Sequence, residues 1–137
     1  MKNREIKFRV WNGAEMIYDV TVGKFGVFYV NPTNNGLDPK DSASITPFTT
    51  KYHDDTPVLQ YTGMKDKNGK EIWEGDVIQF TMIDDAHELG VVRFSEGGYW
   101  TSQLQGYQEE LLYAELNSNL ICKVIGNIYE HPNLIKP

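Results

Sequence analysis

The sequence lacks the features of secreted and membrane-spanning proteins. Its only cysteine is Cys122, so no internal disulfide can form and the chain suits a reducing compartment. The N-terminal segment MKNREIKFRVWNG carries charges where a signal peptide has its apolar core. No later apolar run is long enough to cross a bilayer. We therefore expect a cytoplasmic protein without a membrane partner.

Positive charge is also scarce. The chain has 13 Lys and Arg against 19 Asp and Glu, which gives a formal net charge of −6 and a pI near 5.0. Such a balance argues against strong, nonspecific attraction to nucleic acid, which depends on cations that neutralise phosphates. Basic residues do crowd two places, the first strand (Lys2, Arg4, Lys7, Arg9) and a glycine-containing stretch (Lys65, Lys67, Lys70). A solvated face explains them best, and a nucleic-acid footprint is the alternative.

The stretch MKDKNG, residues 64–69, resembles part of a calcium-binding loop but lacks its key ligands. Asp66, Asn68 and Gly69 align with the third, fifth and sixth positions of an EF-hand loop. The first and twelfth positions are Met64 and Gly75, and neither can supply a carboxylate. We therefore predict a turn with an exposed, charged tip, in which Asn68-Gly69 provides positive φ angles.

Other chemical sites are weakly indicated. Two polar segments hold nitrogen and oxygen ligands that one metal could share in principle, although plain solvation explains them better: His53-Asp54-Asp55, and Asp84-Asp85 with His87-Glu88. Cys122 lies in NLICKVIG, which indicates a strand core rather than a nucleophile. Glu74 and Asp76 beside Trp73 could form a carboxylate pair over a sugar platform, but carboxylates at a glycine turn more often cap backbone amides.

No catalytic residue, metal site or cofactor is therefore expected. The sequence has no phosphate-cradling glycine loop and no serine elbow. A metal-dependent or glycoside-acting enzyme is only a distant alternative.

Alternating apolar residues are what the sequence does contain. Ile6, Phe8 and Val10 define one face of a first strand. A three-residue loop over Asn12 to Ala14 would place Val10 opposite Met16, and Phe8 opposite Tyr18, in a hairpin. We predict that Met16, Tyr18 and Val20 share the inner face of the second strand.

Further strands follow along the chain. They are expected at 23–30, 58–62, 76–83, 90–95, 99–104 and 120–130, with a possible short strand at 45–51. The pair around SEGGYW predicts a hairpin closed by Gly97-Gly98. Residues 109–116 alternate like a strand but have helical composition, and a short helix is favoured. His131-Pro132 predicts a final helical turn.

Numerous short strands predict a mainly β fold, namely a small antiparallel SH3-like barrel or bent sheet with an N-terminal β-hairpin and one or two short helices. We expect one domain over residues 1–137. Residues 1–30 would form the hairpin and third strand, 31–57 a long loop, and 58–137 the barrel core and C-terminal turn.

Three separated blocks resemble the YopX family of phage- and prophage-encoded proteins: REIKFRVWN, LQYTGMKDKNGKEIWEGDVI and VIGNIYEHPNL. They occur in the family's order and span nearly the whole chain, although residues 30–55 and 84–118 match no motif. The resemblance implies a mainly β accessory protein acting in an infected or lysogenic bacterial host cell. It implies no activity and no catalytic residues.

Two functions from different classes remain open. The first is a non-catalytic protein-binding or self-assembling β module for a host or phage protein, with Trp11, Trp73 and Trp100 as anchors where they are exposed; at least one is expected to be buried. The second is a nucleic-acid-associated small barrel. Its phosphate contacts would be Lys7, Arg9, Lys65, Lys67 and Lys70, and Tyr61 or Trp73 would stack on a base. The acidic net charge favours the protein-binding module.

Overall fold

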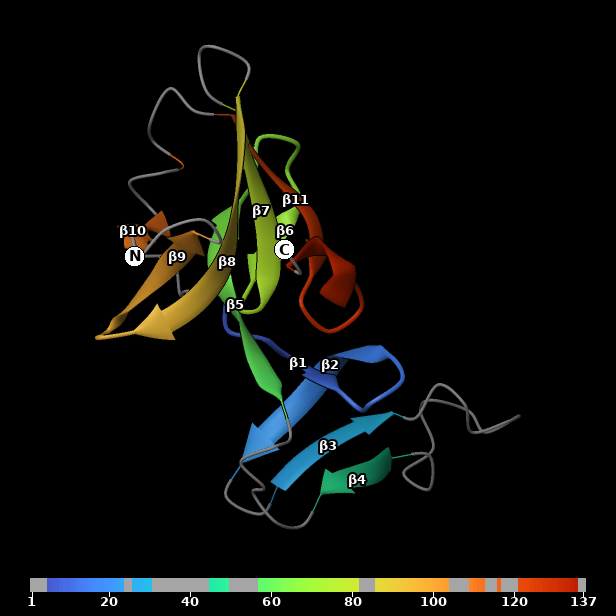
Figure 1. Ribbon diagram of the computed structural model, residues 1–137. Helices are drawn as coiled ribbons and strands as arrows, with labels where there is room; N and C mark the ends of the chain where they lie inside the picture. The colour runs from blue at the N-terminus through green and yellow to red at the C-terminus, as the bar shows by residue number, and fades with distance from the viewer. Residues whose placement is uncertain are drawn as a thin grey trace. The chain divides into compact units, whose positions relative to one another are not determined.

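A computed structural model gives the structure of the chain (Figure 1). It describes residues 5–23, 26–30, 45–49, 57–81, 86–103, 109–112, 116 and 121–135. The fold is mainly β and antiparallel, as the alternation of apolar residues predicted. Most of the predicted loop 31–57 lies outside the described residues.

The chain divides into two compact units. Unit 1 comprises residues 1–5 and 61–137, and unit 2 comprises residues 6–60. Strand β5 (Val58–Lys65) contributes to both, because its start pairs with β1 in unit 2 and its end pairs with β6 in unit 1. The prediction of one domain over residues 1–137 stays a prediction beside this division.

Unit 2 is a meander of four antiparallel strands followed by the start of β5. The strands are β1 (Phe8–Trp11), β2 (Met16–Gly23), β3 (Gly26–Val30) and β4 (Ile45–Thr49). They hydrogen-bond in the order β4-β3-β2-β1-β5. The N-terminal hairpin and the short strand near residue 45 are thus confirmed, whereas the third strand begins later than predicted.

The predicted hairpin register was wrong. Trp11 pairs with Met16 and Val10 pairs with Ile17, so the connection is one residue longer than expected. Asn12 explains the longer connection, because its side-chain Oδ1 accepts hydrogen bonds from the backbone N–H groups of Ala14 and Glu15 at 2.8 Å each. Gly13 in this turn adopts a φ of 97°, and the side-chain bonds of Asn12 stabilise the same turn.

A β-bulge then changes which residues of β2 face the core. The register shifts between Phe8 and Arg9, which pair with Val20 and Tyr18 respectively. The extra residue reverses the alternation along β2. As a result, Ile17 and Val20 both pack with Val10 in a buried cluster, and Tyr18 is exposed. The predicted inner face of Met16, Tyr18 and Val20 was therefore correct only at Val20.

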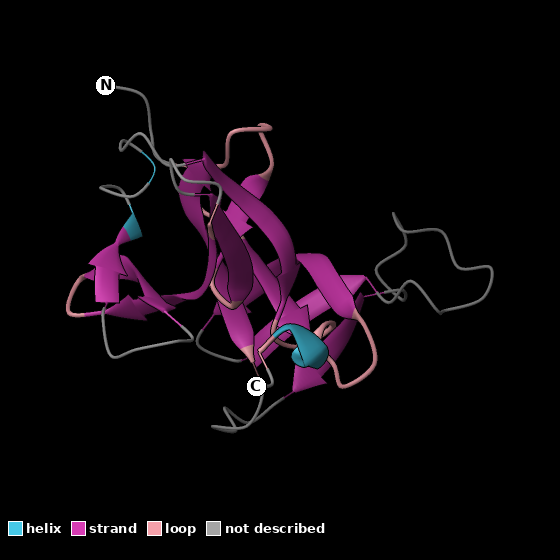
Figure 2. Ribbon diagram, turned by 45° about the horizontal axis from the view of Figure 1, so that its top comes forward, coloured by secondary structure: helices cyan, strands magenta, loops and turns pink. Residues whose placement is uncertain are grey.

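Unit 1 contains a five-stranded antiparallel sheet in the order β10-β9-β8-β7-β11. The strands are β7 (Asp76–Thr81), β8 (His87–Ser95), β9 (Gly98–Gln103), β10 (Glu109–Leu111) and β11 (Ile121–Asn127). The sheet curls into a half-barrel (Figure 2). The bent sheet is thus confirmed, and its likeness to an SH3 barrel stays a prediction.

Two local predictions in this sheet need correction. The β8–β9 hairpin exists, but Ser95 pairs with Gly98, so the turn residues are Glu96 and Gly97 rather than two glycines. The favoured helix over residues 109–116 begins instead with strand β10, and helical backbone is described only at Leu112 and Leu116. Pairing with β9 outweighs the helical propensity of the glutamates.

The second sequence block contains the β5–β6 hairpin. Strand β6 (Glu71–Trp73) is short, and the register with β5 shifts between Tyr61 and Lys65. Gly63 adopts a φ of 83° within this irregular stretch. The Thr62 hydroxyl donates to the Ile72 carbonyl at 2.7 Å and accepts from the Met64 N–H, so a side chain replaces interrupted ladder bonds.

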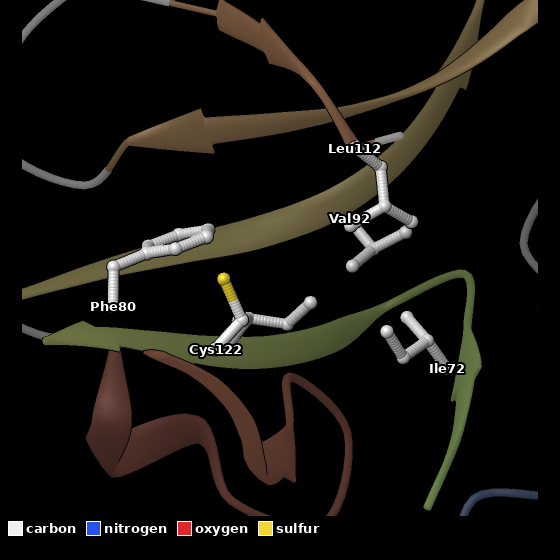
Figure 3. Close-up of a cluster of buried hydrophobic side chains, with 6 residues drawn as sticks. Ile72, Phe80, Val92, Leu112 and Cys122 are labelled. Atoms are coloured by element: carbon white, nitrogen blue, oxygen red, sulfur yellow. The ribbon is translucent and has the colours of Figure 1, made fainter. Parts of the chain in front are cut away.

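The core of unit 1 lies inside the curled sheet (Figure 3). It consists of the buried side chains Ile72, Ile78, Phe80, Val92, Leu112 and Cys122. Cys122 is 0% exposed, which confirms the prediction that it belongs to a strand core. A dry apolar environment of this kind suits a structural rather than a reactive thiol.

The C-terminal block ends the fold in a fixed turn. Asn127 is buried, and its Oδ1 accepts hydrogen bonds from the N–H groups of Tyr129 and Glu130. The short 3₁₀ helix η2 (Pro132–Leu134) confirms the final turn that begins with proline. A Cβ at Gly126 would lie 2.6 Å from Nδ1 of His131, so any other residue there would require the His131 ring to shift. No helix in the described ranges is long and apolar enough to span a membrane.

Candidate binding surfaces

The residues with metal-ligand chemistry do not assemble into a site within the described part of the chain. No group of three or more His, Cys, Asp or Glu side chains there could hold an ion. His87 and Glu88 are exposed, and Nδ1 of His87 lies 3.2 Å from the Thr81 hydroxyl. The other residues considered as possible ligands, His53-Asp54-Asp55 and Asp84-Asp85, lie outside the described residues.

The carboxylate next to Trp73 caps a turn. Asp76 is 3% exposed, and its Oδ2 accepts a hydrogen bond from the Trp73 N–H at 2.8 Å. Gly75 adopts a φ of 85° between them, and its N–H donates to the Val92 carbonyl at 2.9 Å. The capping interpretation is thus confirmed for Asp76, which is not accessible as a catalytic carboxylate, and it stays a prediction for Glu74.

Asp66 is the residue whose role the sequence interpretation missed. It was predicted on an exposed tip, yet it is only 8% exposed. Its Oδ1 accepts from the N–H groups of Asn68 and Lys70, and its Oδ2 accepts from the N–H of Val124, all at 2.9 Å. The third bond joins residues 58 positions apart, so this carboxylate ties the β5–β6 turn to β11.

The neighbouring lysines remain at the surface. Lys65, Lys67 and Lys70 are exposed around the buried Asp66. The Lys67 N–H donates to the Cys122 carbonyl at 3.2 Å, which adds a second bond between the turn and β11. Charged side chains at the tip are thus confirmed for the lysines, and Asp66 has a structural role instead. The predicted positive φ is found at Gly69, at 80°, and the prediction was wrong for Asn68.

Tyr61 and Trp73, which were predicted to stack on a base, pack against each other. They are 4% and 5% exposed, with ring centroids 5.5 Å apart and ring planes inclined by 41°. The expectation that at least one tryptophan is buried is confirmed by Trp73. Their burial leaves neither ring accessible to a ligand in this structure.

Arg9 is likewise buried, at 2% exposure. Its Nη1 donates to the Tyr18 hydroxyl at 3.3 Å, and its guanidinium carbon lies 5.8 Å from the centre of the Tyr18 ring. This cation–π geometry stabilises unit 2 locally. Arg9 therefore has a structural role, whereas Lys7 is half-buried.

Three aromatic residues that are exposed or half-buried lie at the turn end of the β8–β9 hairpin. Phe94 is 57% exposed, and its ring contacts that of Tyr99 edge-on at 5.2 Å. Trp100 is partly exposed, and its Nε1 donates to the Ser95 carbonyl at 2.9 Å. Arg93 is exposed and pairs with Trp100 across the two strands. We call Arg93, Phe94, Tyr99 and Trp100 the aromatic end.

Phe94 was not among the predicted binding residues. A signal for it exists in the sequence, because RFSEGGYW places Phe94 and Tyr99 at equivalent positions on both sides of a two-residue turn. Of the predicted anchors, Trp100 lies in the aromatic end. Trp11 is half-buried at the end of β1 in the other unit.

Comparison with known proteins agrees with this fold. The YopX protein family matches residues 7–136 of the chain. The chain belongs to the YopX family. No curated protein matches it.

Two crystal structures are similar to this YopX-family chain. Protein yopX from Bacillus subtilis is 18% identical, with a TM-score of 0.64, over 95% of this chain and 98% of that chain. Protein EF1440 from Enterococcus faecalis is 22% identical, with a TM-score of 0.65, over 98% of this chain and 100% of that chain. At these identities the similarity shows a shared fold.

The three sequence blocks that resemble the YopX family supply the structure's buried polar side chains. Six polar residues are buried in the described part of the chain: Arg9, Thr62, Asp66, Asp76, Thr101 and Asn127. All except Thr101 lie in these blocks. Since buried polar groups must be hydrogen-bonded, the blocks hold turns and strand irregularities in place. The aromatic end lies between the second and third blocks.

Proposed function

We propose that this protein is a non-catalytic accessory module that binds another protein through the aromatic end of its β8–β9 hairpin. The supporting observation is the exposure of Phe94, at 57%, beside the half-buried Tyr99 and Trp100. Large aromatic side chains and arginine are enriched where protein interfaces gain most of their free energy. Arg93 adds the guanidinium that such surfaces often contain.

The rigidity of this surface also supports binding. Phe94 and Tyr99 are opposite residues on paired strands, and Tyr99 packs against the core of unit 1. The Trp100 indole is oriented by its hydrogen bond to Ser95. Aromatic rings that are already fixed lose little conformational entropy when a partner covers them.

The resemblance to phage and prophage proteins indicates where to look for the partner. We propose a host or phage protein in an infected or lysogenic bacterium, with the module acting in the cytoplasm. The test is co-purification with the tagged protein from such cells, with and without nuclease. A partner that survives nuclease and is retained at least about tenfold less by Phe94→Ala would support the proposal.

Ile121→Ala is the matched control, since Ile121 is an exposed apolar residue on a different strand, at 54%. Its replacement should leave co-purification unchanged. Sedimentation at several concentrations tests self-assembly, which Phe94→Ala would weaken if the partner is a second copy. Equal capture by wild type and Phe94→Ala, or complete loss of the partner with nuclease, would refute binding through this surface.

A further inference from the structure

A second surface of unit 1 carries four exposed lysines. Lys65, Lys67 and Lys70 come from the β5–β6 turn, and Lys123 comes from β11. We call these four residues the lysine patch. Lys123 is 53 or more positions away from the other three in the sequence, so only the fold brings it to them.

Two hydrogen bonds on either side of Lys123 establish this proximity. The Lys67 N–H donates to the carbonyl of Cys122 at 3.2 Å, and the N–H of Val124 donates to Asp66 Oδ2 at 2.9 Å. The turn therefore lies along the edge of β11 that does not pair with β7, as the neighbouring ribbons in Figure 1 show. Lys123 lies between the two bonded positions.

Two acids adjoin this patch: Glu71, which is partly exposed and pairs with Lys65 across β5 and β6, and Asp66 within the turn. Asp66 does not offset the lysines at the surface. Asp66 is 8% exposed; its Oδ1 accepts from backbone N–H groups inside the turn and its Oδ2 accepts from the N–H of Val124 on β11. The Gly69 N–H returns to the Asp66 carbonyl at 3.0 Å, which closes the turn. The backbone that carries the lysines is thus fixed, while their ammonium groups reach water.

Lysine-rich composition distinguishes this surface from a protein-binding one. Lysine is depleted at protein interfaces because a strongly hydrated ammonium is costly to bury, whereas it contacts phosphate readily as a point charge. Such contacts release counterions and do not depend on base sequence. We propose that the lysine patch binds the phosphodiester backbone of nucleic acid without sequence specificity.

This surface is separate from the aromatic end, so the inference does not depend on the proposed protein-binding function. The acidic remainder of the chain limits the affinity of the lysine patch for nucleic acid, because a formal net charge of −6 repels a polyanion. Binding should therefore be weak at physiological salt and strengthen steeply as salt is lowered. With four phosphate contacts, the affinity for duplex DNA should fall about a hundredfold between about 50 and 200 mM salt.

The test is a salt titration of the full chain with short fluorescent DNA, both single-stranded and duplex. Lys67→Gln combined with Lys123→Gln should reduce the slope of log affinity against log salt by about 2 for the duplex. Ala14→Glu combined with Thr21→Glu is the control, because these exposed residues belong to neither surface and the pair makes the same change in net charge. It should leave the slope unchanged, and thermal melting should show that both variants remain folded.

Labelled polyglutamate separates nucleic acid from an acidic protein as the partner. The proposal holds if DNA binds at low salt, the double variant lowers the slope, and polyglutamate of equal charge binds more weakly. Stronger binding of polyglutamate would overturn it in favour of an acidic protein surface. Absence of DNA binding at low salt, or an equal effect of the Ala14→Glu and Thr21→Glu control, would also overturn it.

Discussion

The β5–β6 and β8–β9 turns use similar residues in opposite ways. Each connects antiparallel strands, and each contains an acidic residue followed closely by a glycine with positive φ, 80° at Gly69 and 77° at Gly97. In the first turn Asp66 is buried and bonded to β11. In the second turn Glu96 is exposed and adopts a φ of 50°, in the left-handed region itself.

The first turn is therefore held by tertiary structure and the second by local geometry. Positive φ at both turn residues is typical of a two-residue type I′ hairpin, which matches the twist of its own strands. The β5–β6 turn instead depends on a carboxylate that joins segments far apart in sequence. An acidic residue near a glycine turn can therefore either hold distant segments together, as Asp66 does, or remain exposed to solvent, as Glu96 does.

The largest effect is expected from Asp66→Ala. The substitution removes the acceptor of three backbone N–H groups, two in the turn and one on β11. Charge-assisted bonds of this kind and the cost of unpaired N–H groups together predict a loss of about 3 kcal/mol of unfolding free energy. Chemical denaturation measures it, and Glu96→Ala in the other turn should cost far less.

Asp66→Asn sharpens this prediction. The amide keeps an oxygen for the turn N–H groups but places an NH₂ group against the Val124 N–H, so a smaller loss of about 2 kcal/mol is expected. A loss for Asp66→Ala no larger than for Glu96→Ala would contradict the anchoring role of Asp66 and remove the difference between the two turns.

The next largest effect is expected from Gly69→Val. No atom lies within 4 Å of a Cβ placed at Gly69, so the cost comes from backbone strain at positive φ alone. We expect a destabilisation of about 1 kcal/mol or more, because a β-branched residue disfavours this region strongly. Thermal melting checks it. A melting temperature equal to wild type would show that the turn does not need the glycine.

A small effect of the opposite sign is expected at Glu96. Its φ of 50° is unfavourable for glutamate but well tolerated by asparagine. In type I′ turns, asparagine is preferred at the position that precedes the glycine. Glu96→Asn should raise the unfolding free energy by about 0.5 kcal/mol. Glu96→Ala serves as the control that removes the carboxylate without this preference. No gain over Glu96→Ala would contradict the strain argument.

The sequence predicted strands well and the residues between them poorly. Alternation of apolar residues identified the β1–β2 and β8–β9 hairpins, and Pro132 correctly indicated the last turn. The register of the β1–β2 hairpin was wrong because a bulge in β2 and side-chain bonds from Asn12 change the pairing without changing the apolar pattern. Short-range patterns do not contain that information.

The candidate binding residues show a similar division. Arg9, Tyr61 and Trp73 have the right chemistry for a ligand, yet the fold buries them. Phe94 looked like an ordinary strand residue, but its strand extends past the core. Burial depends on which segments far apart in sequence pack together, so composition and spacing could not distinguish these cases.

The smallest effect is expected from calcium, which should leave stability unchanged. Both Asp66 oxygens already accept N–H groups, and Met64 and Gly75 offer no carboxylate at the positions where a calcium loop needs one. An ion that binds only the folded state must raise the melting temperature by mass action. Melting with excess calcium and with a chelator should therefore give the same midpoint, with magnesium as a control for ionic strength. A calcium-specific rise in melting temperature that Asp66→Asn abolishes would show that the buried carboxylate exchanges its backbone partners for the ion. The β5–β6 turn would then differ from the β8–β9 turn by a calcium site rather than by the hydrogen bonds of Asp66.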